Sequence, residues 1–172
     1  MESAEAILAK VPQVPWFRAA EHAARDEESQ AALAEYLRSC EDEWPGHWAA
    51  GWDEAGRVVR GLDDAASFWQ TEGRWRKQAV AAAVAAGRTE TLADVLHRLS
   101  IAGYDAVRPN APNEELARVA SGAALWTVAE ALTWAVVEDL LAPLPNPFLP
   151  KLQLFELGHW PLGVWQGAIV VL

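Results

Sequence analysis

The amino-acid sequence predicts a mainly α-helical protein, a compact bundle of five to six helices with a small C-terminal β-hairpin. Alanine, the strongest helix former, is the most frequent of its 172 residues. Ten residues are tryptophans, and several recur at helical spacing: Trp44, Trp48 and Trp52 lie four apart, and Trp126 and Trp134 lie eight apart. Residues at these spacings share one face of a helix, so we expect most indole rings to pack between closely spaced helices.

The first forty residues predict two helices separated by prolines. Ser3 can cap a short helix that ends before Pro12, and the two prolines between residues 11 and 15 favour an extended segment. A long helix is expected from about Phe17 to Cys40. The sequence from Glu41 to Pro45 is typical of a break.

Two further helices are expected before residue 88. Pro45 suits the first turn of a helix that holds Trp48 and Trp52, although three glycines weaken it. Asp63 or Asp64 can cap the next helix, which includes an alanine run and ends at Gly87, a favourable residue for a helix C-terminus.

The longest apolar segment predicts the central helix of the bundle. It follows a shorter helix that Thr89 caps and Gly103 closes, and Asn113 can cap its own start. From Glu114 to about Leu141 this segment is apolar on nearly every face, as is usual for a helix that others surround.

The proline-rich segment 143–172 excludes another long helix. We expect a short helix from Lys151 to Leu157, and then strands 162–165 and 168–172 around the turn Gln166-Gly167. Because an isolated hairpin is marginal in water, it must pack on the bundle or pair with another sheet edge. Residues 1–172 are therefore expected to form a single helical domain, with 143–172 packed on it.

Composition narrows the possible partners and the location. The net charge of −10, with 14 basic residues spread along the chain, argues against nucleic-acid binding. The best membrane candidate, 119–137, carries Glu130 in its middle and has too little Leu, Ile or Phe, so no membrane span is expected. Cys40 is the only cysteine and the N-terminus is acidic, which favours a cytoplasmic protein.

The strongest candidate for a binding residue is Glu130, midway between Trp126 and Trp134 on one helical face. Burial between large apolar rings raises the pKa of a carboxyl group, which could then donate a proton or bind a cation. The rings could equally form an aromatic cage for a cation. The structural alternatives are solvent exposure and an ion pair with a neighbouring arginine: Arg57, Arg60, Arg74 or Arg76.

Trp44 and Trp48 are the second candidate feature. They flank a glycine-rich, acidic segment and are the tryptophans most expected to be exposed. Tryptophan is a common anchor residue in protein interfaces. These two residues are therefore candidate contacts for a protein partner.

The sequence carries no catalytic or metal-ligand spacing, and no cofactor motif. The four histidines do not pair with one another or with Cys40 at the spacing that zinc sites use. One metal hypothesis comes from a resemblance: bacterial DinB-like proteins are small helical bundles whose metal is held by histidines on separate helices. His22, His47 and His97 lie on different expected helices, but the paired His-x-x-x-His of that family is absent.

A second resemblance concerns the last 27 residues. The segment Asn146-Pro147-Phe148-x-Pro150, followed by Leu157-Gly158, Pro161, Gly163 and an apolar strand, resembles the ending of certain bacterial proteins in which an Ala- and Trp-rich helical region precedes it. The resemblance implies a bacterial protein and carries no activity. Locally, Asn-Pro is typical of a turn, after which we expect Phe148 to enter the core.

Together these observations favour a non-catalytic interaction or regulatory protein with a protein partner or as a homodimer. The rival hypothesis is a small-molecule binder or enzyme that uses Glu130 in a Trp-lined pocket. It requires a cavity beside Glu130 and a second polar group that converges on it. The DinB-like metal site is a third alternative.

Overall fold

A computed structural model describes residues 3–15, 25–40, 44–62, 66–107 and 113–172, and confirms a mainly α fold. The described residues form eight helices and a three-stranded sheet, somewhat more helices than expected. The elements are α1 (Ala4–Lys10), α2 (Glu27–Ser39), β1 (Gly46–Trp48), α3 (Trp52–Arg60), α4 (Ala66–Ala85), α5 (Thr89–Val107), α6 (Glu114–Val136), α7 (Glu138–Leu141), α8 (Leu149–Glu156), β2 (Pro161–Trp165) and β3 (Ala168–Val171).

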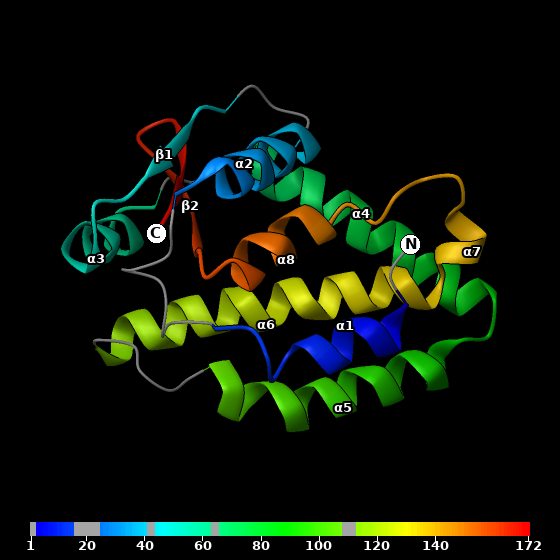
Figure 1. The fold of residues 1–172 in the computed structure, drawn as a ribbon. Coiled ribbons are helices and arrows are strands. Elements are labelled where there is room, and N and C mark those ends of the chain that lie inside the picture. Colours follow the sequence, from blue (N-terminus) through cyan, green and yellow to red (C-terminus); the bar gives the residue numbers. More distant parts are fainter. Residues whose placement is uncertain (1–2, 16–24, 41–43, 63–65, 108–112) are drawn as a thin grey trace.

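Helix α6 is the central element, as its apolar sequence predicts. Figure 1 shows it running across the molecule between α5 and α1 on one side and α8, with α2 and the sheet beyond, on the other. Val128, Ala131 and Leu132 are fully buried. Among the described helices, α6 alone is long and apolar enough to cross a membrane, by length and composition only. Since 62% of that apolar window is buried inside the protein, this is the pattern of a core helix.

Two of the predicted helix caps are confirmed. The Ser3 hydroxyl accepts a hydrogen bond from the backbone N–H of Ala6 (3.2 Å), and the Asn113 side chain accepts one from that of Leu116 (2.8 Å). The predicted end of α5 at Gly103 is wrong, because the helix continues to Val107. A Cβ at Gly103 would lie 2.6 Å from a methyl of Leu125, so this glycine permits the close approach of α5 to α6.

The start of α2 differs from the expectation. It begins at Glu27, and the Asp26 side chain caps it by accepting a hydrogen bond from the backbone N–H of Ser29 (3.0 Å). The earlier part of the predicted helix, 16–24, lies outside the described residues, as do the candidate caps Asp63 and Asp64.

The predicted β-hairpin is present, and a third strand pairs with it. This strand was not predicted, because the spacing of the tryptophans indicated a helix there. Gly46–Trp48 forms β1, which pairs in parallel with β3, so the order is β1-β3-β2. Two hydrogen bonds extend this pairing, from Ile169 N to Pro45 O (2.9 Å) and from Ala49 N to Val171 O (2.8 Å). The predicted helix across Trp48 and Trp52 is therefore wrong: Trp48 lies in a strand and Trp52 begins α3.

Strand β3 joins two groups of buried side chains. We call the group around α6 the α6 core, and the group under α2, which includes Leu33, Tyr36 and Leu154, the α2 core. Val170 and Leu172 belong to the α6 core, whereas Ile169 and Val171 belong to the α2 core. Successive side chains of a strand point to opposite faces, so β3 contributes to both cores at once.

The Asn-Pro-Phe segment forms the expected turn. The Asn146 side chain donates to the Ala131 carbonyl of α6 (2.9 Å) and accepts from the backbone N–H of Phe148 (3.2 Å). Phe148 is buried, and its ring meets those of Trp75 and Trp134 edge-on. These contacts fasten the proline-rich segment to α6 and place α8 beside it.

Candidate functional site

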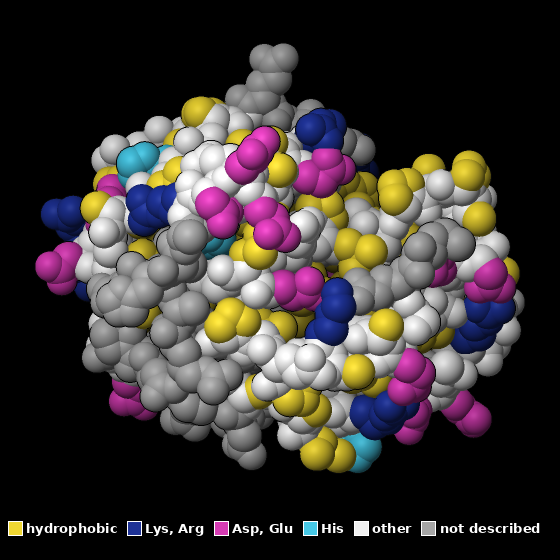
Figure 2. Space-filling view, viewed as in Figure 1, with side chains coloured by type: hydrophobic (Ala, Val, Ile, Leu, Met, Phe, Trp, Pro, Cys, Tyr) yellow, Lys and Arg dark blue, Asp and Glu magenta, His cyan; other side chains and the backbone are white. Residues whose placement is uncertain are grey.

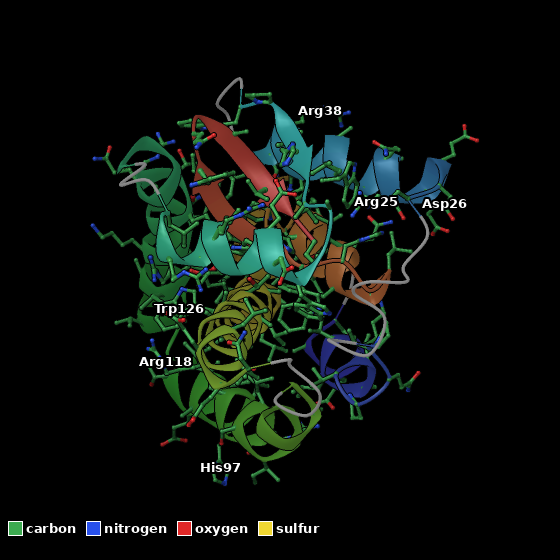
Figure 3. All side chains as sticks on the ribbon, turned by 90° about the vertical axis from the view of Figure 1, so that its left-hand side faces the viewer. Arg25, Asp26, Arg38, His97, Arg118 and Trp126 are labelled. Atoms are coloured by element: carbon green, nitrogen blue, oxygen red, sulfur yellow. The ribbon has the colours of Figure 1, made fainter. Side chains whose placement is uncertain are left out.

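Glu130 lies in the middle of α6 and is only 4% exposed. The two tryptophans that flank it in sequence have different environments. Trp134 is fully in the α6 core, whereas Trp126 is 54% exposed. Figure 3 shows Trp126 and Arg118 along the same side of α6, facing away from α1. Glu130 is therefore a core carboxyl group one helical turn below a surface indole, and not a group enclosed by two buried rings.

Arg76 of α4 is the arginine that pairs with Glu130. Its guanidinium lies 3.6 Å from Glu130 Oε1. An ion pair with one of four arginines, Arg76 among them, was the structural alternative that the sequence offered for Glu130. The same guanidinium carbon lies 5.0 Å from the centre of the Trp126 ring. The position that an aromatic cage would offer to a bound cation is thus occupied by the chain's own Arg76.

A second ion pair lies beside Glu130, between residues that the sequence did not single out. Lys151 of α8 donates a hydrogen bond to Glu72 Oε1 of α4 at 3.1 Å, and both side chains are more than nine-tenths buried. The Lys151 ammonium also lies 5.8 Å from the ring centre of Tyr36 on α2. Helices α2, α4, α6 and α8 therefore each supply one or two polar side chains to a buried cluster, which we call the carboxylate cluster: Tyr36, Glu72, Arg76, Glu130 and Lys151.

The electrostatics of the cluster allow Glu130 to keep its proton up to about neutral pH. Burial, and secondarily the Glu72 carboxylate, raise the pKa of Glu130 to about 7, against the opposing effect of Lys151 and Arg76. No hydrogen bond of normal geometry reaches either Glu130 oxygen from the described residues, and the nearby Trp126 side chain has the smallest of the effects that lower this pKa. Burial, reinforced by Glu72, raises the pKa of Tyr36 well above its usual range, so its phenol stays neutral.

A pocket of about 230 Å³ opens next to the cluster. Glu72, Lys151 and Tyr36 form its polar wall, and Trp126 stands at its edge. The remaining wall comes from α6 and β2 and is apolar or backbone: Gly122, Ala123, Pro161, Leu162 and Gly163. The Glu130 hypothesis requires a cavity beside Glu130 itself. This pocket is lined by Glu72 and Lys151 instead, and Glu130 lies one turn of α6 from Trp126, outside the lining.

The sequence offers a weak signal for one of the missed residues and none for the other two. Lys151 is the single charge in an apolar stretch that includes Leu152, Leu154 and Phe155, a context in which a buried lysine could be suspected. Glu72 and Tyr36 lie in helical sequences of mixed polar and apolar residues that do not single them out. Their convergence depends on tertiary packing of α2 and α4 and not on local spacing.

Trp44 and Trp48, the candidate interface anchors, are half-buried and pack against the α2 core. The Trp48 ring lies 4.7 Å from that of His159, and its indole N–H donates to the Gln30 side chain at 3.4 Å. The Arg25 guanidinium carbon lies over the Trp48 ring, 5.5 Å from its centre. The tryptophan that lines the pocket beside the carboxylate cluster is Trp126, and neither Trp44 nor Trp48 is among its lining residues.

The histidines of the DinB-like hypothesis do not come together within the described part of the chain. His47 on β1 lies 3.0 Å from Glu54, and His97 lies on α5, on the opposite side of α6 (Figures 1 and 3). His22 is outside the described residues. Among those that are described, no three His, Cys, Asp or Glu side chains are placed to hold a metal ion.

Comparisons with protein families, with curated proteins and with solved structures find no match to this chain. The function is therefore inferred from the fold and the carboxylate cluster alone.

Proposed function

We propose that this protein binds a small metabolite in the pocket beside the carboxylate cluster. The observation that carries the proposal is the convergence of Glu72, Lys151 and Tyr36 from three helices on one cavity. Its volume, about 230 Å³, lies below the roughly 300–1,000 Å³ of sites for drug-sized ligands, so the ligand is small.

The energetics of buried charge support a role in binding. Replacing a buried ion pair with apolar residues of similar size is often neutral or stabilising, so Glu72 and Lys151 are poorly explained by stability alone. Buried titratable groups with a shifted pKa beside a cavity are enriched at binding sites. The cluster combines such a group, Glu130, with an open cavity.

The test is a thermal-shift screen of small metabolites with two matched variants. Ala123→Leu adds a side chain to the wall of the pocket, whereas Ala81→Leu makes the same change at an exposed position of α4. Metabolites that raise the melting temperature of the wild type should lose their effect in Ala123→Leu and keep it in Ala81→Leu. A screen in which no compound binds, or in which Ala123→Leu retains every binder, would contradict the proposal.

A second candidate function, interaction with a protein partner or self-association, is favoured by a separate groove. The groove, about 480 Å³, lies between α2, α4 and the proline-rich segment, and Trp75, Trp134 and the exposed Leu144 line it. Figure 2 shows hydrophobic side chains gathered in the hollow between α2 and α7. The Trp134 indole N–H has no hydrogen-bond partner among the described residues.

The oligomeric state tests this second candidate. Size-exclusion chromatography with light scattering should show a dimer for the wild type and a monomer for Leu144→Asp if the groove is an interface between two copies. A monomeric wild type would exclude self-association and leave interaction with a different protein as the second candidate function. In either case we propose a cytoplasmic protein, because its single cysteine, Cys40, cannot form a disulfide within the chain.

A further inference from the structure

The pocket beside the carboxylate cluster has a lining that distinguishes between ligands of opposite charge. If the proposed function is correct, this lining identifies the class of ligand. Three features bear on the charge of the ligand: the cation that already lies over the Trp126 ring, the hydrogen-bond donors that remain on Lys151, and the charge of the whole cluster.

The groups that would attract a cationic ligand already engage cations of the protein. The Arg76 guanidinium already lies 5.0 Å from the Trp126 ring centre and 3.6 Å from Glu130 Oε1. Glu72 is likewise engaged by Lys151 at 3.1 Å. A ligand ammonium would have to compete with one of these two internal cations for its counter-charge, and both cations would repel it.

An anionic ligand finds unused donors. An ammonium group has three N–H donors, and among the described residues Lys151 makes one hydrogen bond, to Glu72 Oε1. Lys151 lines the pocket, so its remaining N–H groups are available to a carboxylate or other anion. The apolar wall formed by Pro161, Leu162 and the Trp126 ring suits a hydrocarbon body on that anion.

The charge of the cluster depends on Glu130, which faces Glu72 and Arg76 of α4, Lys151 of α8 and the neutral Tyr36 of α2. When Glu130 is protonated, Lys151 and Arg76 outweigh Glu72 by one positive charge. When Glu130 is ionised, the four charges cancel. The protonated form therefore attracts an anion. In addition, an anion that draws Lys151 away from Glu72 increases the repulsion between the Glu72 and Glu130 carboxylates, and this repulsion favours protonation of Glu130.

We propose that the pocket binds a small organic anion with an apolar body through Lys151, and that Glu130 takes up a proton as the anion binds. Linkage then requires the affinity to fall as the pH rises through the range in which Glu130 ionises in the free protein. Glu130 acts by changing the net charge of the cluster and does not contact the ligand.

Benzoate and benzylammonium, which share a ring and differ in charge, are the probes. We expect isothermal titration calorimetry at constant ionic strength to show benzoate binding at least about tenfold more tightly than benzylammonium. Benzoate affinity should fall by about threefold or more from pH 6 to pH 8.5, on either side of the Glu130 pKa of about 7. Buffers with different ionisation enthalpies should report proton uptake with binding.

Three variants separate the parts of the inference. Glu130→Gln should bind benzoate with equal affinity at both pH values and without proton uptake. The double variant Glu72→Gln/Lys151→Met, which removes both members of the buried ion pair, should lose benzoate binding, whereas Lys77→Met, at an exposed lysine of α4, should keep it.

The outcomes distinguish this inference from the proposed function. If metabolites bind in a manner blocked by Ala123→Leu, but benzylammonium binds as tightly as benzoate, the inference fails and the proposed function stands. The same holds if the pH dependence persists in Glu130→Gln, or if the double variant still binds benzoate. If no metabolite and neither probe binds at millimolar concentration, both fail.

Discussion

At the scale of single residues, Glu130 illustrates how a helical core handles a charge that it cannot fully solvate. The side chain is 4% exposed, no hydrogen bond of normal geometry reaches its oxygens from the described residues, and Arg76 stands at 3.6 Å, beyond a strong hydrogen bond. Under these conditions the neutral carboxyl is favoured up to neutral pH. Part of the pH dependence of the protein's stability should therefore come from this residue.

We expect Glu130→Gln to remove that dependence. The pKa of Glu130 rises from 4.5 to about 7 on folding, so the folded state holds the proton more tightly. The resulting stabilisation is complete below about pH 4.5 and is lost as the pH rises to about 7, a change on the order of 3 kcal/mol. Urea unfolding of both proteins should give similar free energies near pH 4.5, and above pH 7 the Gln variant should be more stable.

The difference between the two proteins is the quantity to measure. Ion pairs with Arg98 and Arg88 lower the pKa of the surface carboxyls Glu5 and Asp139, respectively, which makes stability rise with pH in both proteins and cancels in the difference. A difference that stays constant across this pH range would contradict the assigned environment of Glu130.

The Glu72–Lys151 pair gives the second prediction at this scale. Lys151→Met leaves a carboxylate buried without its partner, which typically costs about 3–5 kcal/mol. Adding Glu72→Gln removes that charge, so the double variant should recover most of the loss. The free energies of unfolding, measured with urea at neutral pH, form a double-mutant cycle. A double variant as unstable as Lys151→Met would show that the pair is not the source of the cost.

The candidate site could be predicted only in part from the sequence. Glu130 was identified because its neighbours Trp126 and Trp134 lie on the same helix, where spacing determines proximity. Glu72 and Lys151 lie 79 residues apart in the chain, on different helices, and no periodicity relates them. The exposure of Trp126 could not be predicted either, because it depends on which neighbours cover that side of α6.

At the scale of elements, the helices could be predicted from local sequence, whereas β1 depends on residues far away in the chain. Helices α1 and α6 begin at the predicted caps because a cap is a local interaction between residues three apart. Strand β1 has three residues, and backbone pairing with β3, more than a hundred residues later, defines it. The spacing of Trp44, Trp48 and Trp52 therefore indicated a helix, but residues 46–48 pair with the edge of the hairpin instead.

Strand β2 yields a prediction because Gly163 has a backbone conformation that other residues rarely adopt. Its φ is +129°, it lies at an irregularity in the pairing with β3, and a Cβ there would lie 2.9 Å from a methyl of Leu62. We expect Gly163→Ala to cost about 1–3 kcal/mol in thermal or urea unfolding.

The matched control is Gly122→Ala. Gly122 also lines the pocket, but it is helical and a Cβ there would meet no atom within 4 Å. This change should stabilise the protein by about 0.5–1 kcal/mol, because alanine is the better helix former. Equal effects of the two substitutions would refute the role assigned to the backbone of Gly163.

At the scale of the whole molecule, the α6 core and the α2 core share the elements at the C-terminal end of the chain. Helix α8 gives Leu152 and Phe155 to the α6 core and Leu154 to the α2 core, and β3 alternates in the same way. Neither core can lose its packing without disturbing the other, which is why we expect one cooperative unit.

Substitutions on opposite faces of β3 test this expectation. Val170 lies in the α6 core and Val171 in the α2 core, and both are fully buried, so each change to alanine should cost about 2–3 kcal/mol. In urea, the helical circular dichroism signal and tryptophan fluorescence should give one coincident transition for the wild type and for both variants. If the cores were independent, Val171→Ala would unfold the α2 core first and separate the two signals. Coincident transitions in all three proteins would mean that β3 couples the carboxylate cluster, which includes Tyr36 from the α2 side, to the stability of the entire chain.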